Sequence, residues 1–201
     1  MATTLLIQAD SARMAVNLPT LSQMTVPEFY EFCQANPELR IERSAAGEVI
    51  IMSPAFSDTG NRNFNLAVQF GVWAEKDGTG IGFDSSAGFT LPNGATRAPD
   101  VAWIKTDRWN LLTDSEKASF APLCPDFVVE LRSASDRLNS LQAKLQEYVE
   151  NGAVLGWLID LKQRQVHIYR PNQTPQILEN PEAVSGEPEL PGFILKMAKV
   201  W

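Results

Sequence analysis

Two carboxylates stand inside apolar runs that have the composition of β-strands. Glu130 lies in the middle of the run 126–133, and Asp100 lies in the run 97–105. An unpaired carboxylate in apolar surroundings is costly, so each one predicts a partner such as a cation or a metal ion. Neighbouring strands lie about 4.8 Å apart, and pairing of these two strands would let both carboxylates approach one small ion. Oxygen ligands of this kind suit Mg²⁺ or Mn²⁺.

A third carboxylate, Asp126, lies on the same predicted strand as Glu130 but does not fit the same site. The two residues are four positions apart, which is about 13 Å at roughly 3.3 Å per residue. A metal ion bonds to each oxygen at about 2.1 Å, so Asp126 and Glu130 are too far apart to share one.

A lysine and a further carboxylate complete the set of residues that could carry chemistry: Glu42, Asp100, Glu130 and Lys144. A metal ion held by two carboxylates polarises a phosphoryl oxygen and lowers the pKa of a bound water. A nearby lysine orients the attacking water or stabilises the charge that develops. In the structural alternative, Glu130 pairs with Arg132 or Lys144 in an ion-pair network. Glu42 then lies on the solvated face of a hairpin.

Histidine and cysteine are too rare for the common hydrolase and zinc sites. His167 is the only histidine, and it lies in a late strand-like run far from any serine or cysteine in a recognisable nucleophile turn. This disfavours serine or cysteine hydrolysis. One histidine and two distant cysteines, Cys33 and Cys124, do not build a usual zinc site. The two cysteines are expected to be free thiols in a reducing cytoplasm.

Length and charge limit the class of protein further. At 201 residues with 44% hydrophobic residues, one domain with a sizeable core is expected. No apolar run approaches the roughly 20 residues that cross a bilayer, and the N-terminus lacks the pattern of a secretory signal. The net charge of −7 argues against non-specific binding of nucleic acid by the whole surface, but it is compatible with a local basic groove.

Hydrophobic periodicity and breaker residues predict both helices and strands. Residues 1 to about 19 are polar and predict an irregular, loosely held arm, and Thr25 with Glu28 predicts a capping box. The predicted helices cover residues 26–34, 58–75, 109–121 and 139–151. The predicted strands cover residues 39–43, 48–52, 81–84, 87–91, 97–105, 126–133, 155–160, 165–170 and 176–178.

The predicted helix 58–75 is amphipathic, and its apolar residues indicate which face it buries. Asp58 or Thr59 is expected to cap its N-terminus. The apolar C-terminal residues 193–201 are expected to pack back on the core. The residues of the helix that are predicted to face inward are Phe64, Val68, Val72 and Trp73.

The ordered series of these residues resembles a known family. Pro99-Asp100 followed by Glu130-Leu131-Arg132 resembles the PD-(D/E)XK signature of restriction-endonuclease-like nucleases. The wider pattern covers about residues 25 to 201 and is similar to one bacterial family of restriction endonucleases within that superfamily. The matching pieces are the stretches 42–54, 98–101 and 125–169, with Ser133, Asp136, Lys144, Tyr148, Gly152, Trp157 and Asp160.

The resemblance implies a fold, a domain and a site. The implied fold is α/β (α+β), with a central mixed β-sheet flanked by helices. A single nuclease domain over residues 25–201 would follow an N-terminal arm, 1–24. The implied site is an Mg²⁺-dependent phosphodiesterase in which Asp100 and Glu130 bind the metal. Glu42 would be the acidic residue contributed by the preceding hairpin.

The resemblance offers two residues for the catalytic cation. The plain motif places it at Arg132, but arginine remains charged and is a poor proton carrier. In this family the lysine lies on the following helix, which points to Lys144. The family also often has a histidine near the start of its first long helix, where this chain has Gly60-Asn61-Arg62-Asn63.

Two functions are compatible with these observations. The favoured one is a cytoplasmic, Mg²⁺- or Mn²⁺-dependent endonuclease that hydrolyses phosphodiester bonds in DNA and has no membrane partner. A homodimer is expected because it presents two active sites to two strands, and the segment ending at Trp201 is a candidate contact. The alternative is a catalytically silent nucleic-acid-binding or scaffold protein on the same fold, which the acidic charge and the missing histidine favour. Metal binding that depends on Asp100 and Glu130 would separate the two.

Overall fold

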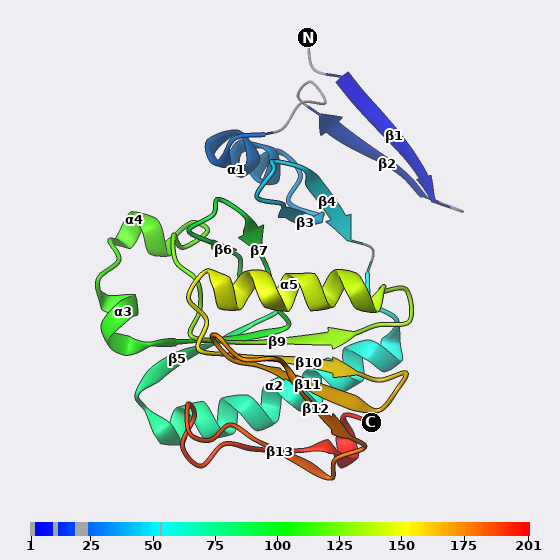
Figure 1. Ribbon diagram of the computed structural model, residues 1–201. Helices are drawn as coiled ribbons and strands as arrows, with labels where there is room; N and C mark the ends of the chain where they lie inside the picture. Colours follow the sequence, from blue (N-terminus) through cyan, green and yellow to red (C-terminus); the bar gives the residue numbers. More distant parts are fainter. Residues whose placement is uncertain (1–2, 10–11, 19–23, 53) are drawn as a thin grey trace. The chain divides into compact units, whose positions relative to one another are not determined.

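Two parts of the chain, interleaved in sequence, form separate units (Figure 1). The N-terminal unit comprises Met1–Pro54 and Asn93–Arg97, and the sheet unit comprises Ala55–Pro92 and Ala98–Trp201. The computed structural model describes residues 3–9, 12–18, 24–52 and 54–201.

A six-stranded sheet forms the centre of the sheet unit. Its strands are β5 (Gly80–Asp84), β8 (Val101–Lys105), β9 (Phe127–Arg132), β10 (Leu155–Asp160), β11 (Gln165–Tyr169) and β12 (Gln176–Glu179). Their spatial order is β12-β11-β10-β9-β8-β5. β9 and β10 are parallel, whereas the other neighbours are antiparallel. The sheet is therefore mixed, which confirms the prediction.

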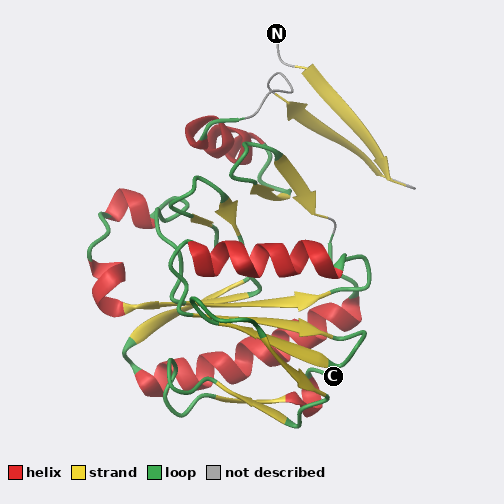
Figure 2. Ribbon diagram, in the orientation of Figure 1, coloured by secondary structure: helices red, strands yellow, loops and turns green. Residues whose placement is uncertain are grey.

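Helices cover both faces of this sheet. Two long helices lie on opposite sides of it in Figure 2: α2 (Ser57–Asp77) and α5 (Leu138–Glu150). Side-chain alternation along β9 explains this arrangement, because consecutive residues of a strand point to opposite faces. Val129 belongs to the core cluster that contains Phe70 of α2, whereas Glu130 contacts Lys144 of α5. The predicted fold class, a central mixed sheet flanked by helices, is confirmed.

The β9–α5–β10 segment is the predicted strand–helix–strand centre. α5 joins two parallel strands, which need a long crossover rather than a tight turn. Leu145 and Tyr148 anchor the helix on the sheet and are fully buried. Gly152 follows the helix with a φ of 118°, a conformation that glycine adopts readily. β10 then runs beside β9 with Leu158 opposite Glu130.

Aromatic rings fill the face of the sheet that α2 covers. Phe193 stacks on Trp157 with ring centroids 5.4 Å apart, and its ring meets that of Phe70 edge-on at 5.3 Å. The chain around Phe193 forms β13 (Ala183–Ser185), β14 (Ile194–Lys196) and a short 3₁₀ helix, η1 (Met197–Lys199). Val200 is buried, and Trp201 donates its indole N–H to the Pro181 carbonyl at 3.0 Å. The C-terminal segment therefore packs on the core of its own chain, as expected.

The face that α2 turns to the sheet differs from the prediction. The buried residues are Leu66, Phe70 and Ala74, and the exposed ones include Phe64, Val68 and Val72. Trp73 packs against the core as predicted. Both stripes recur every four residues, so helical periodicity alone does not choose between them. The sheet selects the Phe70 stripe because that ring contacts Phe127 and Phe193.

Two helix boundaries also differ from the prediction. α2 begins at Ser57 with Phe56 at the N-cap and no side-chain cap hydrogen bond, so the caps predicted at Asp58 and Thr59 are wrong. The predicted helix 109–121 is replaced by two short ones, α3 (Thr106–Asn110) and α4 (Asp114–Lys117). Thr113 and Glu116 form a capping box, which starts a new helix rather than continuing the old one.

The N-terminal unit begins with a hairpin that was not predicted. β1 (Thr3–Ala9) and β2 (Ala12–Leu18) pair along their whole length, so the prediction of an irregular chain over these residues is wrong. The predicted boundary between the arm 1–24 and the domain 25–201 adjoins residues 19–23, which lie outside the described residues. That division of the chain stays a prediction.

The rest of the N-terminal unit follows the sequence signals closely. α1 (Val26–Ala35) starts with the predicted capping box of Thr25 and Glu28. β3 (Arg40–Arg43) and β4 (Val49–Met52) form the predicted hairpin. A later strand, β7 (Thr96–Arg97), pairs with β3 through Arg43 and Thr96. The remaining short strand, β6 (Phe89–Thr90), belongs to the sheet unit and bridges to Ala121.

Candidate metal and active site

Asp100 directly precedes β8, next to the last pair of the β8–β9 ladder. Val101 is the ladder partner of Val129, and the Asp100 backbone N–H donates to the carbonyl of the same Val129 at 3.0 Å. The backbone hydrogen bond of Asp100 is thus offset by one residue from the β8–β9 register. Simple alternation along β8 does not fix the direction of the Asp100 carboxylate.

Hydrogen bonds from β9 and from α2 hold the Asp100 carboxylate. Its Oδ2 accepts from the backbone N–H of Leu131 at 2.8 Å, and its Oδ1 accepts from Nδ2 of Asn63 at 3.1 Å. Leu131 follows Glu130 directly on β9. The structure therefore anchors the Asp100 carboxylate on the backbone of β9, next to the residue that carries the second predicted carboxylate.

Glu130 is buried, with 5% of its surface exposed, and it has partners on α5. Its Oε1 lies 2.7 Å from Nζ of Lys144 and accepts a hydrogen bond from the Tyr148 hydroxyl at 3.1 Å. Residues four apart lie on the same side of a helix, and Lys144 Nζ also lies 5.9 Å from the centre of the Tyr148 ring. The structure thus brings together Glu130 and Lys144, two of the residues selected from the sequence.

Arg132, the other candidate cation, is engaged elsewhere. Its guanidinium lies 2.6 Å from Oδ2 of Asp160, a residue with no exposed surface. Arg132 and Asp160 are register partners on the parallel strands β9 and β10. The guanidinium also donates to the Asp136 carbonyl at 3.3 Å. This pair ties the ends of two strands together, and Glu130 is paired with Lys144 rather than with Arg132.

The loop after β9 is held by its own contacts. Asp136 accepts hydrogen bonds from the backbone N–H and the hydroxyl of Ser133, at 2.7 and 2.6 Å. Lys162 donates to the Ala134 carbonyl at 2.7 Å. Ser133 and Asp136, which the sequence pattern includes, therefore shape the turn that follows Glu130 and Arg132.

Glu42 belongs to the N-terminal unit. It is buried on β3 and lies 3.2 Å from Arg97 of β7, in the same unit. Glu42 is thus an ion-paired, buried carboxylate rather than part of a solvated hairpin face. Its assignment to the catalytic site stays a prediction.

Asp126 has a structural role, in keeping with its exclusion from the metal site. One of its oxygens lies 2.9 Å from the Arg108 guanidinium, and the other accepts from the Lys105 backbone N–H at 2.9 Å. These contacts fix the chain between β8 and α3 to the start of β9. They account for a carboxylate that is 4% exposed without a metal ion.

The oxygen atoms around Asp100 suit a small, hard cation. In the ranges that the structure describes, no cluster of three or more His, Cys, Asp or Glu side chains could hold a metal, so carboxylates alone do not complete a site. However, Oδ1 of Asn63 is buried and has no hydrogen-bond partner among the described residues. Mg²⁺ in proteins commonly uses one or two carboxylates with other oxygens and water. Asp100, Glu130 and this amide oxygen fit that donor set.

The sequence did not single out Asn63 as a site residue. It pointed instead to a polar segment at the start of the long helix, where the family often has a histidine. Helix geometry could have singled out residue 63 within that polar segment, because it lies three positions before Leu66, on the side of α2 that turns towards the sheet. Asn63 reaches Asp100 from that side.

The sole histidine lies two strands from Glu130 in the sheet register, and the Cys124 thiol donates to the Tyr148 backbone carbonyl at 3.3 Å. Burial lowers the pKa of His167, although the carboxylates of Asp160 and Glu179 oppose the shift. Burial raises the pKa of the Cys124 thiol to about 12 and that of Cys33 to about 11. Both thiols are therefore protonated at neutral pH, which agrees with the exclusion of a cysteine nucleophile.

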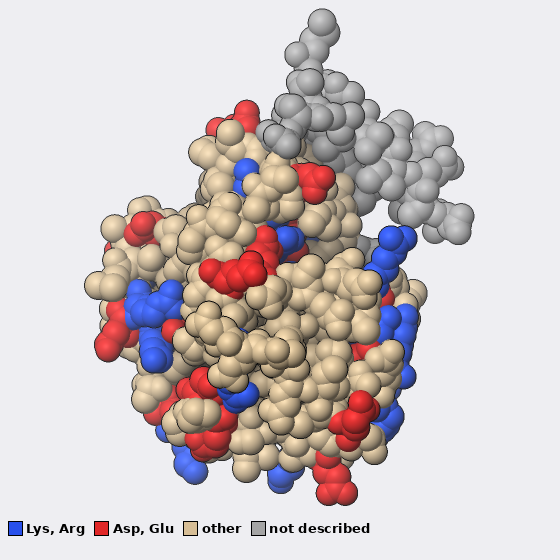
Figure 3. Space-filling model, viewed as in Figure 1, with Lys and Arg blue, Asp and Glu red and all other residues tan. Residues whose placement is uncertain are grey.

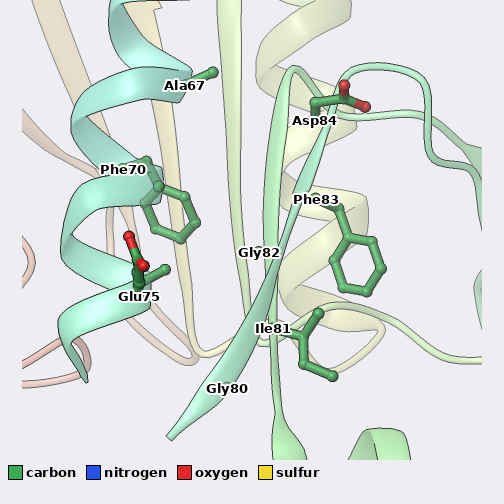
Figure 4. Close-up of a pocket in the computed structure, with 10 residues that line it drawn as sticks. Ala67, Phe70, Glu75, Gly80, Ile81, Gly82, Phe83 and Asp84 are labelled. Atoms are coloured by element: carbon green, nitrogen blue, oxygen red, sulfur yellow. The ribbon is translucent and has the colours of Figure 1, made fainter. Parts of the chain in front are cut away.

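An open hollow lies away from these residues. Figure 4 shows an open hollow between α2, from Ala67 to Glu75, and the edge strand β5. Asp100, Glu130 and Lys144 do not line it. Its walls are largely apolar, with Phe70 on one side and the glycine-rich strand on the other.

A mixed sheet with helices on both faces, and with Asp100 and Glu130 on neighbouring strands, defines the class as a restriction-endonuclease-like fold. A solved structure described as a "putative nuclease belonging to DUF820", from Anabaena variabilis ATCC 29413, has a similar fold. The TM-score is 0.71 at 18% sequence identity, and the match covers 88% of this chain and 97% of that one.

The model of the Uma2 family, described as "Putative restriction endonuclease", matches residues 26–198. The chain belongs to this family, which bears out the resemblance seen in the sequence. No curated protein matches the chain. Within the described residues, no helix combines the length and the apolar character needed to cross a membrane.

Proposed function

We propose that this chain is a metal-dependent endonuclease that hydrolyses phosphodiester bonds in DNA, with Mg²⁺ or Mn²⁺ as cofactor. The observation that carries the proposal is the buried contact between Glu130 and Lys144, one residue from the backbone amide that holds Asp100. A carboxylate pair on neighbouring strands with an adjacent lysine is the set of groups that such hydrolysis requires. Membership of the Uma2 family and the nuclease-like fold support the same reaction.

Asp100 and Glu130 are the residues that would hold the ion. When bound, a divalent ion polarises a phosphoryl oxygen and lowers the pKa of a coordinated water. Leu131 fixes Asp100 through its backbone amide, and Tyr148 fixes Glu130 through its hydroxyl. Both carboxylates are therefore oriented before substrate binds, which reduces the reorganisation that the reaction requires.

Lys144 would supply the positive charge. Its Nζ already lies beside Glu130, so it is placed to orient an attacking water or to stabilise the charge that develops on the phosphate. Arg132 is less suited because its guanidinium is paired with the fully buried Asp160. Glu42 is proposed as the additional acidic residue, with Arg97 as its partner in the N-terminal unit.

The distribution of charge supports DNA as the substrate. The chain carries a net charge of −7, so binding cannot rest on the bulk surface. Figure 3 shows basic side chains along the right-hand edge of the drawn face, on the side where β9 and β10 end in Figure 1. A local basic edge at the carboxyl ends of these strands would contact phosphates near the site.

A homodimer in the cytoplasm is part of this proposal. Cleavage of both strands of a duplex is most simply achieved by two copies of one active site, and two-fold dimers are the commonest assemblies. Trp201 and its neighbours pack within their own chain, so they are no longer the preferred contact. Both cysteines are free thiols, which agrees with a reducing compartment.

The second candidate is a catalytically silent nucleic-acid-binding or scaffold protein on the same fold. The observation in its favour is that Glu130 already has a cation and a hydrogen-bond donor without any metal. In that reading the Glu130–Lys144–Tyr148 group is a structural ion-pair network. Such a protein would not need Asp100 or Glu130 for tight binding of Mn²⁺.

Cleavage of plasmid and oligonucleotide DNA with Mg²⁺ and Mn²⁺ tests the proposal. The wild-type chain should cut, whereas Asp100→Asn and Glu130→Gln should not. Glu75→Gln is a matched control, because it removes an exposed carboxylate of α2. Calorimetry with Mn²⁺ on the same proteins distinguishes the failures. Cleavage that survives in both site variants contradicts the assignment, and Mn²⁺ binding without cleavage supports the silent protein.

A further inference from the structure

One polar group of the Asn63 side chain, Nδ2, has a hydrogen-bond partner, whereas the other, Oδ1, has none among the described residues. It lies in the second turn of α2, and its Nδ2 donates to Oδ1 of Asp100 at 3.1 Å. Its Oδ1 is buried and has no hydrogen-bond partner in the described part of the chain. Buried carbonyl oxygens in native proteins nearly always have a partner, so this atom indicates a group that binds there.

The orientation of the amide is fixed by its neighbour. If the side chain were turned over, its carbonyl oxygen would face the Asp100 carboxylate, and two acceptors would oppose each other. The N–H group must therefore point to Asp100, because a carboxylate accepts and does not donate. The oxygen of Asn63 is then the amide atom that is left without a partner among the described residues.

We propose that Asn63 is a ligand residue of the divalent-cation site, which rests on the function proposed above. Its Oδ1 contributes to the oxygen shell of the ion that Asp100 holds, and its Nδ2 fixes the Asp100 carboxylate. Amide carbonyls are ordinary ligands of hard cations, and Mg²⁺ needs more oxygen ligands than two carboxylates provide. An incoming cation satisfies Oδ1, which explains why the residue keeps an acceptor without a partner.

This role differs from that of a residue that merely positions Asp100. A positioning residue needs the donor Nδ2, whereas a ligand residue needs the acceptor Oδ1. Asn63→Asp separates the two roles, because it keeps an oxygen and removes the N–H donor. Asn63→Ala removes both. Asn65→Ala is the matched control: Asn65 lies on the same helix, and its amide donates to the Asn61 carbonyl instead.

Titration calorimetry with Mn²⁺ alone, without DNA, is the test. Asn63→Ala should weaken Mn²⁺ binding at least tenfold, the usual scale for loss of a group that supports a metal site. Asn63→Asp should bind Mn²⁺ as tightly as the wild type or more tightly, because it keeps the oxygen and adds a charge. Asn65→Ala should bind Mn²⁺ as the wild type does.

Thermal unfolding with and without Mn²⁺ provides the second measurement. The rise in melting temperature caused by Mn²⁺ should be reduced in Asn63→Ala and kept in Asn63→Asp. If both variants lose Mn²⁺ binding equally, Asn63 acts through Asp100 and the ligand role is overturned. If Asn63→Ala binds as the wild type does, it is also overturned. A wild-type chain that binds no Mn²⁺ would instead contradict the function on which this inference rests.

Discussion

The carboxylate of Asp100 takes the place of a backbone acceptor for the Leu131 amide, at 2.8 Å across the β8–β9 ladder. This contact makes the direction of Asp100 depend on β9, the strand that carries Glu130. The two carboxylates are thus positioned by one strand, although they are thirty residues apart in sequence.

Neutralising either carboxylate should remove the response to metal. Asp100→Asn and Glu130→Gln should lose the stabilisation that excess Mn²⁺ gives the wild type, about 2.7 kcal/mol at a hundred times the Kd. Without metal, both variants should be less stable by about 1–3 kcal/mol, since each loses a hydrogen bond or ion pair to a charged group. Urea unfolding with and without Mn²⁺ measures both effects. Stabilisation by Mn²⁺ that persists in both variants would rule out the site.

Loss of Lys144 should chiefly reduce cleavage, whereas loss of Arg132 should chiefly reduce stability. Lys144→Ala should reduce cleavage by at least about a hundredfold, because a charge aimed at the reacting phosphate is lost. Arg132→Ala should chiefly reduce stability, by about 3–5 kcal/mol, because it leaves Asp160 buried without its partner. Cleavage assays at a temperature where both variants are folded make the comparison. The assignment is wrong if Arg132→Ala alone abolishes cleavage.

The two apolar stripes of α2 should respond differently to truncation. Phe70→Ala should cost about 3–5 kcal/mol, because the ring is buried against Phe127 and Phe193. Phe64→Ala should change stability by no more than about 0.5 kcal/mol, because 66% of Phe64 is exposed. Chemical denaturation of both variants is the measurement. Equal losses would mean that α2 is rotated from the orientation described above.

His167 should make stability depend on pH below neutrality. Burial lowers its pKa in the folded chain, so between the unfolded value of about 6.5 and the lower folded value the unfolded chain binds more protons. Stability should therefore fall as the pH drops through this window, by at most about 1.4 kcal/mol per pH unit. His167→Gln should lose less stability than the wild type between pH 7.5 and pH 5.5. Parallel pH profiles for the two proteins would contradict this assignment.

The assembly should be a dimer in solution. Light scattering at micromolar concentrations should give twice the mass of the single chain for the wild type. Removal of the Trp201 ring should leave this mass unchanged, because the indole bonds to Pro181 of its own chain. A monomer under these conditions would contradict the dimer.

The sequence was most informative where a charged residue occurs within an apolar run. Glu130 in an apolar strand required a partner, and the sequence offered a metal ion, Arg132 or Lys144. The structure pairs it with Lys144. The strand, helix and strand that form β9, α5 and β10 followed from their apolar patterns. These inferences succeeded because they depend on local pattern and on the cost of an unpaired charge.

Features that are decided by contacts between distant parts of the chain were not predicted. α2 has two apolar stripes of equal spacing, and the choice between them is made by Phe127 and Phe193 of other elements. The contact between Asp100 and the Leu131 amide depends on the register of two chain segments, which no single segment specifies. Asn63 was missed for the same reason, because its partner lies far along the chain.

The interleaving of the two units has a consequence for the order in which the protein can form during synthesis. β3 and β4 leave the ribosome early, but their unit is completed by β7, which follows α2 and β5 in the chain. The first elements of the sheet unit are therefore synthesised before the N-terminal unit has all its strands. A nascent chain that stalls before Thr96 leaves β3 without its β7 partner. Expression of residues 1–54 as a fragment should consequently yield a less protease-resistant product than the same residues within the whole chain.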